Sequence, residues 1–182
     1  MSVPFKHSEI ETWKTFVHSN QSYDLSHLNA HKASYLDVRN NQNYDFIVTY
    51  SFHCFTCSYK DSPNPGITYQ APLEKRPFDF GRYHLSKQLP EIIHNLHNKE
   101  MVQVGHAKDA RYAAIKLLNH EGIEVDYYVV FNVFREFKKY RIHISSAYPN
   151  DNIGKVSKVD FFSLAVSLAK GRKLPKPPPK SF

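Results

Sequence analysis

Residues 123–148 read IEVDYYVVFNVFREFKKYRIHISSAY, two long runs rich in β-branched and aromatic residues on either side of a Lys-Lys pair. Such residues favour strands, and a short polar break between two runs of them is typical of a hairpin. Upstream, residues 110–118 are followed by Asn-His-Glu-Gly, which we interpret as a second turn. The alanines and Lys116 of that segment also favour a helix, but its place before a long strand favours a hairpin partner. The sequence therefore predicts an antiparallel meander.

The rest of the chain is expected to add one more strand and three helices. Phe46 to Cys57 is dense in β-branched and aromatic residues and predicts a central strand. Helical spacing of apolar residues predicts helices over residues 8–17, 85–98 and 156–169. We expect an ordered loop or one helical turn over residues 18–45, where Tyr23 to Leu28 is the most apolar point, and a long loop over the proline-rich residues 62–77. Together these segments predict an α+β fold, with an antiparallel sheet of four or more strands and about three helices packed mainly on one face.

Length and charge point to one domain with a basic tail. A chain of 182 residues with 41% apolar residues fits a single α+β domain, which we expect over residues 1–170. Five of the seven net positive charges lie in residues 170–182, so the body is not strongly basic. The prolines of residues 171–182 favour an exposed polyproline II tail, which is either an electrostatic or proline-ligand arm or a solvated terminus. No window approaches the ~20 apolar residues of a membrane span, and no secretion signal is recognisable, so we expect a cytoplasmic protein with no membrane partner.

Cys54 and Cys57 form a C-x-x-C pattern, which is found in redox and metal sites. A redox pair normally lies at a helix start, whereas positions i and i+3 of the expected strand face opposite sides. His53 and the two cysteines lack a further Cys or His pair at zinc-finger spacing. Gly-rich phosphate loops, the serine-hydrolase elbow and the H-E-x-x-H helix are also absent from the sequence. We interpret the cysteines as small buried hydrophobic residues and expect neither a metal nor a cofactor.

Polar side chains in strand or strand-end contexts remain as candidates for a site. A metal-independent ribonuclease needs a base for the 2′-hydroxyl proton, an acid for the leaving 5′ oxygen, and cations or hydroxyls at the phosphorane oxygens. The candidates are His53, Arg82, Ser146 and Tyr148 for catalysis, and His27, Arg76 and Ser145 for substrate binding. The same residues also fit structural roles, such as a core histidine, a salt-bridged arginine or a serine at a strand end.

Five short segments carry a first resemblance: Tyr23 to Leu28 (YDLSHL), Phe52 to Thr56 (FHCFT), Arg76 to Asp79 (RPFD), Arg82 to Ser86 (RYHLS) and Ser146 to Tyr148 (SAY). In this order they resemble a bacterial and mobile-element group labelled stationary phase growth adaptation proteins. The resemblance covers most of residues 23–150 and implies little about activity.

A second resemblance lies in the last expected strand, YRIHISSAYP over residues 140–149. It is similar to the last strand of the barnase, EndoU, colicin and RelE superfamily of metal-independent ribonucleases, where a Ser or Thr precedes an apolar residue, an aromatic residue and often a proline. This resemblance implies that Ser146 and Tyr148 take phosphate-binding and base-contacting positions, with an upstream histidine as general base. The sequence departs from the superfamily in lacking a recognisable upstream His-and-Lys pair, which leaves the identity of the base open.

The leading hypothesis is a small metal-independent endoribonuclease, a toxin or growth-regulating protein that leaves a 2′,3′-cyclic phosphate. Under it, His53 acts as base or acid and Arg82 stabilises the phosphorane. Ser146 holds the phosphate, and Tyr148 stacks on a base or orients it. The alternatives are a non-catalytic binding module for a protein or nucleic acid, aided by the basic tail, and an antitoxin-like or host-takeover protein that blocks a partner's site.

Overall fold

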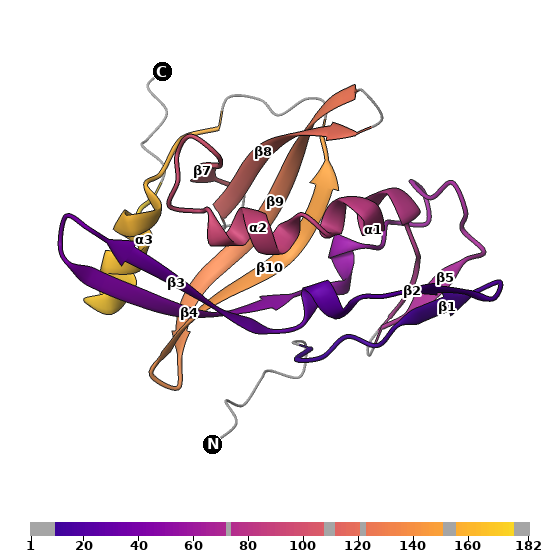
Figure 1. Cartoon of the computed structure of the whole chain (residues 1–182), viewed down its shortest axis with the longest axis horizontal. Coiled ribbons are helices and arrows are strands. Elements are labelled where there is room, and N and C mark those ends of the chain that lie inside the picture. The colour runs from indigo at the N-terminus through magenta and orange to yellow at the C-terminus, as the bar shows by residue number, and fades with distance from the viewer. Residues whose placement is uncertain (1–9, 72–73, 108–111, 121–122, 151–155, 177–182) are drawn as a thin grey trace.

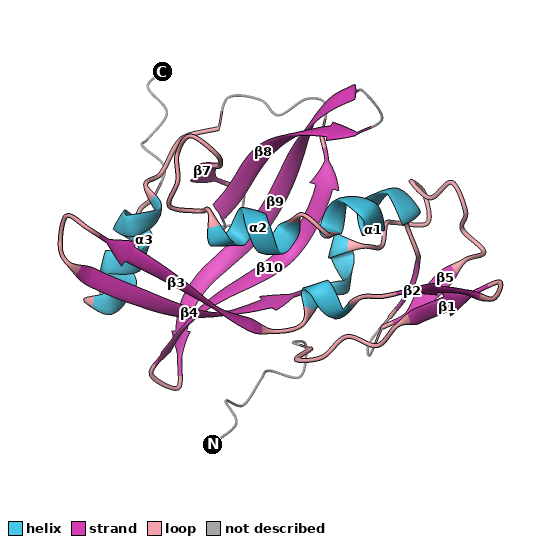
Figure 2. Ribbon diagram, in the orientation of Figure 1, coloured by secondary structure: helices cyan, strands magenta, loops and turns pink. Residues whose placement is uncertain are grey.

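The computed structural model describes residues 10–71, 74–107, 112–120, 123–150 and 156–176. A strongly twisted six-stranded sheet in the order β3-β4-β10-β9-β8-β7 forms its centre (Figures 1 and 2). Its strands are β3 (His31–Asp37), β4 (Gln42–Tyr50), β7 (Gln103–His106), β8 (Tyr112–His120), β9 (Ile123–Glu136) and β10 (Lys139–Pro149). The expected α+β class is confirmed.

Smaller elements surround this sheet. Two hairpins pair β1 (Phe16–His18) with β2 (Gln21–Tyr23) and β5 (Thr68–Gln70) with β6 (Lys75–Pro77). The helices are α1 (Phe80–Ser86), α2 (Leu89–His94) and α3 (Phe161–Ala169), with short 3-10 helices η1 (Ser26–Leu28) and η2 (Phe52–Cys54). Within the described part of the chain, no helix has the length and apolar character of a membrane span.

The meander of β8, β9 and β10 is confirmed, with antiparallel pairing throughout. Phe137 and Lys138 form the turn between β9 and β10, both with positive φ, the backbone hand that matches strand twist in tight hairpins. On its other side β10 pairs in parallel with β4. The sheet is therefore mixed at its centre, because the chain leaves β4, crosses to the far edge at β7 and winds back to β10.

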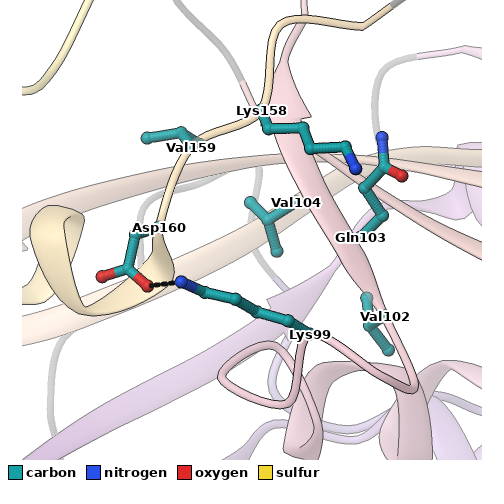
Figure 3. A pocket seen from close by; sticks show the side chains of 7 residues that line it. All are labelled: Lys99, Val102, Gln103, Val104, Lys158, Val159 and Asp160. Carbon is teal, nitrogen blue, oxygen red and sulfur yellow. Dashed lines mark ion pairs between the residues drawn. The ribbon is translucent and has the colours of Figure 1, made fainter.

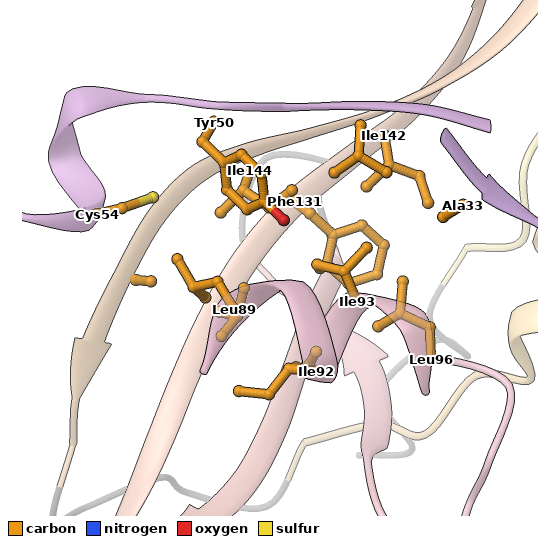
Figure 4. Packing of buried hydrophobic residues seen from close by; sticks show 14 of the residues in the cluster. Ala33, Tyr50, Cys54, Leu89, Ile92, Ile93, Leu96, Phe131, Ile142 and Ile144 are labelled. Atoms are coloured by element: carbon orange, nitrogen blue, oxygen red, sulfur yellow. The ribbon is translucent and has the colours of Figure 1, made fainter. Parts of the chain in front are cut away.

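The helices cover one face of the sheet, as expected. Leu89, Ile92 and Ile93 of α2 are fully buried. Figure 4 shows Leu89 and Ile93 on the side of α2 that faces Phe131 of the sheet. Tyr35 of β3 links two helices to this face. Its hydroxyl donates a hydrogen bond to the Ile93 carbonyl, and its ring lies 4.5 Å from that of Phe161 in α3. Burial of these apolar side chains is the main stabilising contribution to the domain.

The N-terminal helix expected over residues 8–17 is wrong for the described residues 10–17. Ile10 instead forms an antiparallel bridge with Tyr50, and Phe16 and Val17 belong to the β1–β2 hairpin. Trp13 is buried by an edge-on ring contact with Phe55 at 5.2 Å. The apolar residues of this segment have helical spacing, but here they pack against residues far along the chain. These tertiary contacts outweigh the weak helix preference of a short segment.

Within residues 18–45, η1 is the one helical turn that the sequence allowed, but the expected loop is wrong for the rest of the segment, since it contains β2, β3 and the start of β4. In β3, alternate residues such as Ala33 and Tyr35 are buried, while Lys32 and Ser34 point outward. Because β3 is an edge strand with a polar outer face, its sequence lacks the continuous apolar run of a central strand.

The strand expected over Phe46–Cys57 begins at Gln42 and ends at Tyr50. Ser51 then caps η2, its hydroxyl oxygen accepting a hydrogen bond from the backbone N–H of His53 at 3.3 Å. His53 therefore lies in a 3-10 turn, and its expected place in a strand is wrong. Residues 62–77 are mainly a loop, as expected, but include the β5–β6 hairpin.

Two expected helices have different bounds. Residues 85–98 form the end of α1 and a separate α2, since Pro90 lacks an N–H group and lies in the first turn of the second helix. The C-terminal helix begins at Phe161 rather than near residue 156, because residues 157–159 lie extended along β7.

In the tail, the Pro175 carbonyl accepts a hydrogen bond from the Tyr112 hydroxyl at 3.1 Å. Residues 177–182 lie outside the described part.

Candidate functional site

His53, Arg76, Arg82 and Tyr148 lie close together in the structure, and Glu74 joins them. His53 interacts electrostatically with Glu74, Arg76 and Arg82, and the Arg82 guanidinium lies over the Tyr148 ring. We call these five residues the His–Arg cluster. They come from η2, the end of the β5–β6 hairpin, α1 and β10, which are far apart along the chain.

Backbone pairing brings these elements together. Thr56, just after η2, forms an antiparallel bridge with Phe78, and the Cys57 N–H donates to the Pro77 carbonyl at 3.1 Å. Ser51, the residue that caps η2, donates its N–H to the Ile144 carbonyl of β10 at 2.9 Å. The segment carrying His53 is thus fixed between the segment carrying Arg76 and the strand carrying Tyr148.

His53 is the titratable centre of the cluster, and about a third (33%) of its side chain is exposed. Its Nε2 atom lies 3.7 Å from Oε1 of Glu74. Partial burial lowers the pKa of His53 below 6.5, and the positive charges of Arg76 and Arg82 lower it further, while Glu74 opposes this shift. The imidazole is therefore mainly neutral at pH 7, the form that can accept a proton.

Arg82 is held rigidly. Its Nη1 donates to the Thr56 carbonyl at 3.0 Å, and its Nε lies 3.8 Å from Oδ2 of Asp79. Its Cζ lies 5.4 Å from the centre of the Tyr148 ring, within the range of a cation–π contact. Asp79 also caps α1, because its Oδ1 accepts the Arg82 backbone N–H at 2.9 Å. These contacts place a fixed positive charge beside the histidine.

Arg76 supplies the second cation. Its Nη1 lies 3.4 Å from Oε2 of Glu74, and only 22% of its side chain is exposed. Its Nε is buried and has no hydrogen-bond partner within the part of the chain that the structure describes. A planar guanidinium that is partly exposed can bind the oxygens of an anionic group such as a phosphate.

Ser145 and Ser146 lie at an irregularity of β10, where the pairing with β9 shifts by one residue. Ser145 is the extra residue, and its hydroxyl donates to the Val130 carbonyl at 3.2 Å, a structural contact. After the bulge, Ala147 is buried, while half-buried Ser146 and Tyr148 point to the opposite side of the strand. Ser146 and Tyr148, two positions apart after the bulge, therefore share one face of β10.

His27 lies on η1 and contacts the last turn of α1 rather than the His–Arg cluster. The Ser86 hydroxyl donates to the Tyr83 carbonyl at 2.7 Å, so Nε2 of His27 donates to Ser86 Oγ at 2.8 Å. Burial lowers the pKa of His27. This hydrogen bond ties η1 to α1, which is a structural role.

The two cysteines are free and buried. Cys54 lies in η2, and burial raises the pKa of its thiol to about 12, so the reactive thiolate is not formed near neutral pH. Burial also raises the pKa of Cys57. Over the described ranges, His, Cys, Asp and Glu side chains form no group of three or more that could hold a metal ion.

Glu74 is the member of the cluster that sequence reasoning missed. It lies in the proline-rich loop two positions before Arg76, and 44% of its side chain is exposed. A single glutamate in such a loop has no periodicity or spacing that marks it, and only the folded hairpin shows that it faces His53.

Comparison with known proteins places the chain in a family. The model of the YjaZ family matches residues 15–169, which include the whole His–Arg cluster. The chain belongs to the YjaZ family. It is 37% identical over 177 residues to Protein YjaZ of Escherichia coli (strain K12), covering 93% of this chain and 97% of that protein. No solved structure matches the chain. Membership of the YjaZ family agrees with the first resemblance in pointing to a bacterial family, and it carries no link to a ribonuclease superfamily.

Proposed function

We propose that the protein is a metal-independent endoribonuclease whose active site is the His–Arg cluster. The observation that carries the proposal is a partly exposed histidine with a lowered pKa beside two arginines and a glutamate. A neutral imidazole next to fixed positive charge suits a reaction that removes a proton while negative charge builds up on a phosphate.

In the proposed reaction the neutral imidazole of His53 accepts the proton of a ribose 2′-hydroxyl. The 2′ oxygen then forms a bond to the adjacent phosphorus, and the bond from phosphorus to the 5′ oxygen breaks. The leaving oxygen takes a proton from a water molecule, which reaches the cluster because His53 is partly exposed. The His53 imidazolium gives its proton to the hydroxide that remains, so the neutral imidazole is restored. The products are a 2′,3′-cyclic phosphate and a free 5′-hydroxyl.

The remaining cluster residues have separate roles in this proposal. Glu74, 3.7 Å from His53 Nε2, stabilises the imidazolium that forms when the proton is accepted. Arg76 and Arg82 bind the phosphorane oxygens. Tyr148 orients Arg82 through the ring contact and offers a surface for a nucleobase.

The likeness of residues 140–149 to the last strand of the barnase, EndoU, colicin and RelE superfamily supports the same proposal. Ser146, on the same side of β10 as Tyr148, is then the phosphate-contacting hydroxyl. We further propose that the protein acts on cellular RNA in the cytoplasm as a toxin or growth regulator, with an antitoxin or inhibited host protein as its protein partner.

The proposal is tested by incubating the purified protein with total RNA in excess EDTA and resolving the products on a denaturing gel. The wild type should cleave, and His53→Ala should lose about 100-fold or more of the rate, the usual contribution of one acid–base group. His94→Ala, which removes an exposed histidine of α2, is the matched control and should retain the wild-type rate.

Intact RNA in every lane would sink the ribonuclease assignment. If the wild type then still retained RNA on a filter, the cluster would be an anion-binding surface without catalysis. Equal cleavage by the wild type and His53→Ala would remove His53 from the mechanism.

A further inference from the structure

A pocket that shares no residue with the His–Arg cluster lies between β7, the turn after α2 and the segment before α3 (Figure 3). Its volume is about 220 Å³. Val102, Val104 and Val159 form its apolar wall, and polar side chains surround them. The pocket is smaller than the ~300 Å³ lower bound of typical drug-sized sites, so it suits a short ligand.

The walls of this pocket are fixed by the backbone. The Val159 N–H donates to the Val104 carbonyl at 3.0 Å, and the His106 N–H donates to the Ser157 carbonyl at 2.8 Å. Gly105 permits this close approach, since a Cβ there would lie 2.3 Å from Cγ1 of Val156. The pocket is therefore built into the fold, because the segment before α3 is pinned to the edge of the sheet.

Charge on the rim is positive. The carboxylate of Asp160 is already used, since it lies 2.8 Å from Nζ of Lys99 and accepts the Ser163 backbone N–H at 3.1 Å as the cap of α3. Lys158 is exposed and forms no ion pair with any residue that the structure describes. Figure 3 shows the Lys158 ammonium pointing toward the Gln103 side chain across the mouth of the pocket.

The pocket combines an apolar wall, an amide and an ammonium that forms no ion pair with a described residue, and this combination suits one chemical class of ligand. We infer that this pocket binds a small amphipathic carboxylate, with its short apolar body against the three valines and its carboxylate on Lys158 and Gln103. A cationic ligand would be repelled by the ammonium groups of Lys158 and Lys99 at the rim. A neutral ligand would gain no ion pair with Lys158, so a carboxylate should bind more tightly than either. This site does not depend on the proposed ribonuclease activity.

Hexanoate is a suitable probe, and hexylamine and 1-hexanol are its cationic and neutral counterparts. Titration of the full-length ¹⁵N-labelled protein should show saturable shifts of the Val102, Gln103 and Val104 amide signals with hexanoate. Lys158→Gln should weaken hexanoate binding about threefold, as expected for one partly exposed charge pair. Lys32→Gln removes another exposed lysine, on β3, and should leave the hexanoate Kd unchanged.

Several results would overturn the inference. They are the absence of saturable shifts at these amides, equal binding of hexylamine and hexanoate, or an unchanged hexanoate Kd in Lys158→Gln. Since Lys158 and Lys32 are both exposed, neither substitution should unfold the protein, and the far-ultraviolet circular dichroism of both variants should match the wild type.

Discussion

His53 gains its proposed reactivity from what surrounds it. A histidine on its own titrates near 6.5, and here partial burial and the charges of Arg76 and Arg82 lower its pKa, while Glu74 limits the shift. The same set of charges would bind and polarise a phosphate. The proton acceptor and the anion-binding groups are thus parts of one electrostatic unit, and a change in either affects the other.

The pH dependence of cleavage follows from the direction of this shift. Because the pKa of His53 in the free protein is lowered, its neutral form persists to lower pH, so the acid limb of kcat/KM, which reports the free enzyme, should have its midpoint below 6.5. Arg76→Gln removes a charge that lowers this pKa, and the midpoint should move to higher pH. An acid limb centred above 6.5 in the wild type would contradict the proposed role of His53.

Arg82→Lys tests whether geometry matters as well as charge. Lysine keeps the positive charge but cannot both donate to the Thr56 carbonyl and lie flat on the Tyr148 ring. We expect turnover to fall about tenfold or more, while RNA affinity in a filter-binding assay changes within about threefold. Arg135→Lys, whose guanidinium lies over the Tyr140 ring, is the control and should behave as the wild type. Unchanged turnover of Arg82→Lys would mean that charge alone is sufficient.

Most members of the cluster were predictable from the sequence, but its geometry was not. His53, Arg76, Arg82 and Tyr148 were candidates because their chemistry suits phosphate transfer, yet nothing in their spacing showed that they meet. The bridge between Thr56 and Phe78 and the capped turn at Ser51 create the site, and both depend on tertiary contacts. Ser145 and His27, by contrast, have their hydroxyl and imidazole in structural hydrogen bonds.

At the scale of elements, the meander and part of β4 could be predicted from the sequence, and β1, β2 and β3 could not. β8, β9 and β10 carry a local signal of apolar runs and short turns. The N-terminal strands are short or lie at an edge, so their pairing depends on partners far along the chain. The same distinction explains α3, which begins late because residues 157–159 are held along β7.

Gly105→Ala tests this attachment of the segment before α3. The new Cβ would lie 2.3 Å from Val156 Cγ1 and 2.9 Å from the Ser157 carbonyl oxygen, so the segment must move. We expect the free energy of unfolding, measured by urea denaturation, to fall by about 1–3 kcal/mol. Gly66→Ala is the control, since nothing lies within 4 Å of its Cβ, and it should change stability by less than about 0.5 kcal/mol. Equal free energies of unfolding for the two variants would show that close packing of residues 156–159 on Gly105 does not stabilise the domain.

At the scale of the whole molecule, the first part of the tail belongs to the domain. Leu174 packs against the core, and the Pro175 carbonyl accepts the Tyr112 hydroxyl. Removing residues 177–182 should leave the free energy of unfolding and the cleavage of a short RNA unchanged. Removing residues 174–182 should lower the free energy of unfolding by about 1–3 kcal/mol, because one apolar contact and one hydrogen bond are lost. Equal urea midpoints for the two truncations would contradict this role of Leu174 and Pro175.

The parallel pairing of β4 with β10 also has a consequence for synthesis on the ribosome. Thr49 and His143, joined across this pair by a 2.9 Å hydrogen bond, are 94 positions apart in the chain. At a translation rate of about 5–20 residues per second, roughly 5–20 s pass between the synthesis of β4 and the synthesis of β10, its parallel neighbour. During that interval the β3–β4 hairpin has an unpaired inner edge, and a nascent chain in this state is a substrate for chaperones that bind exposed strands.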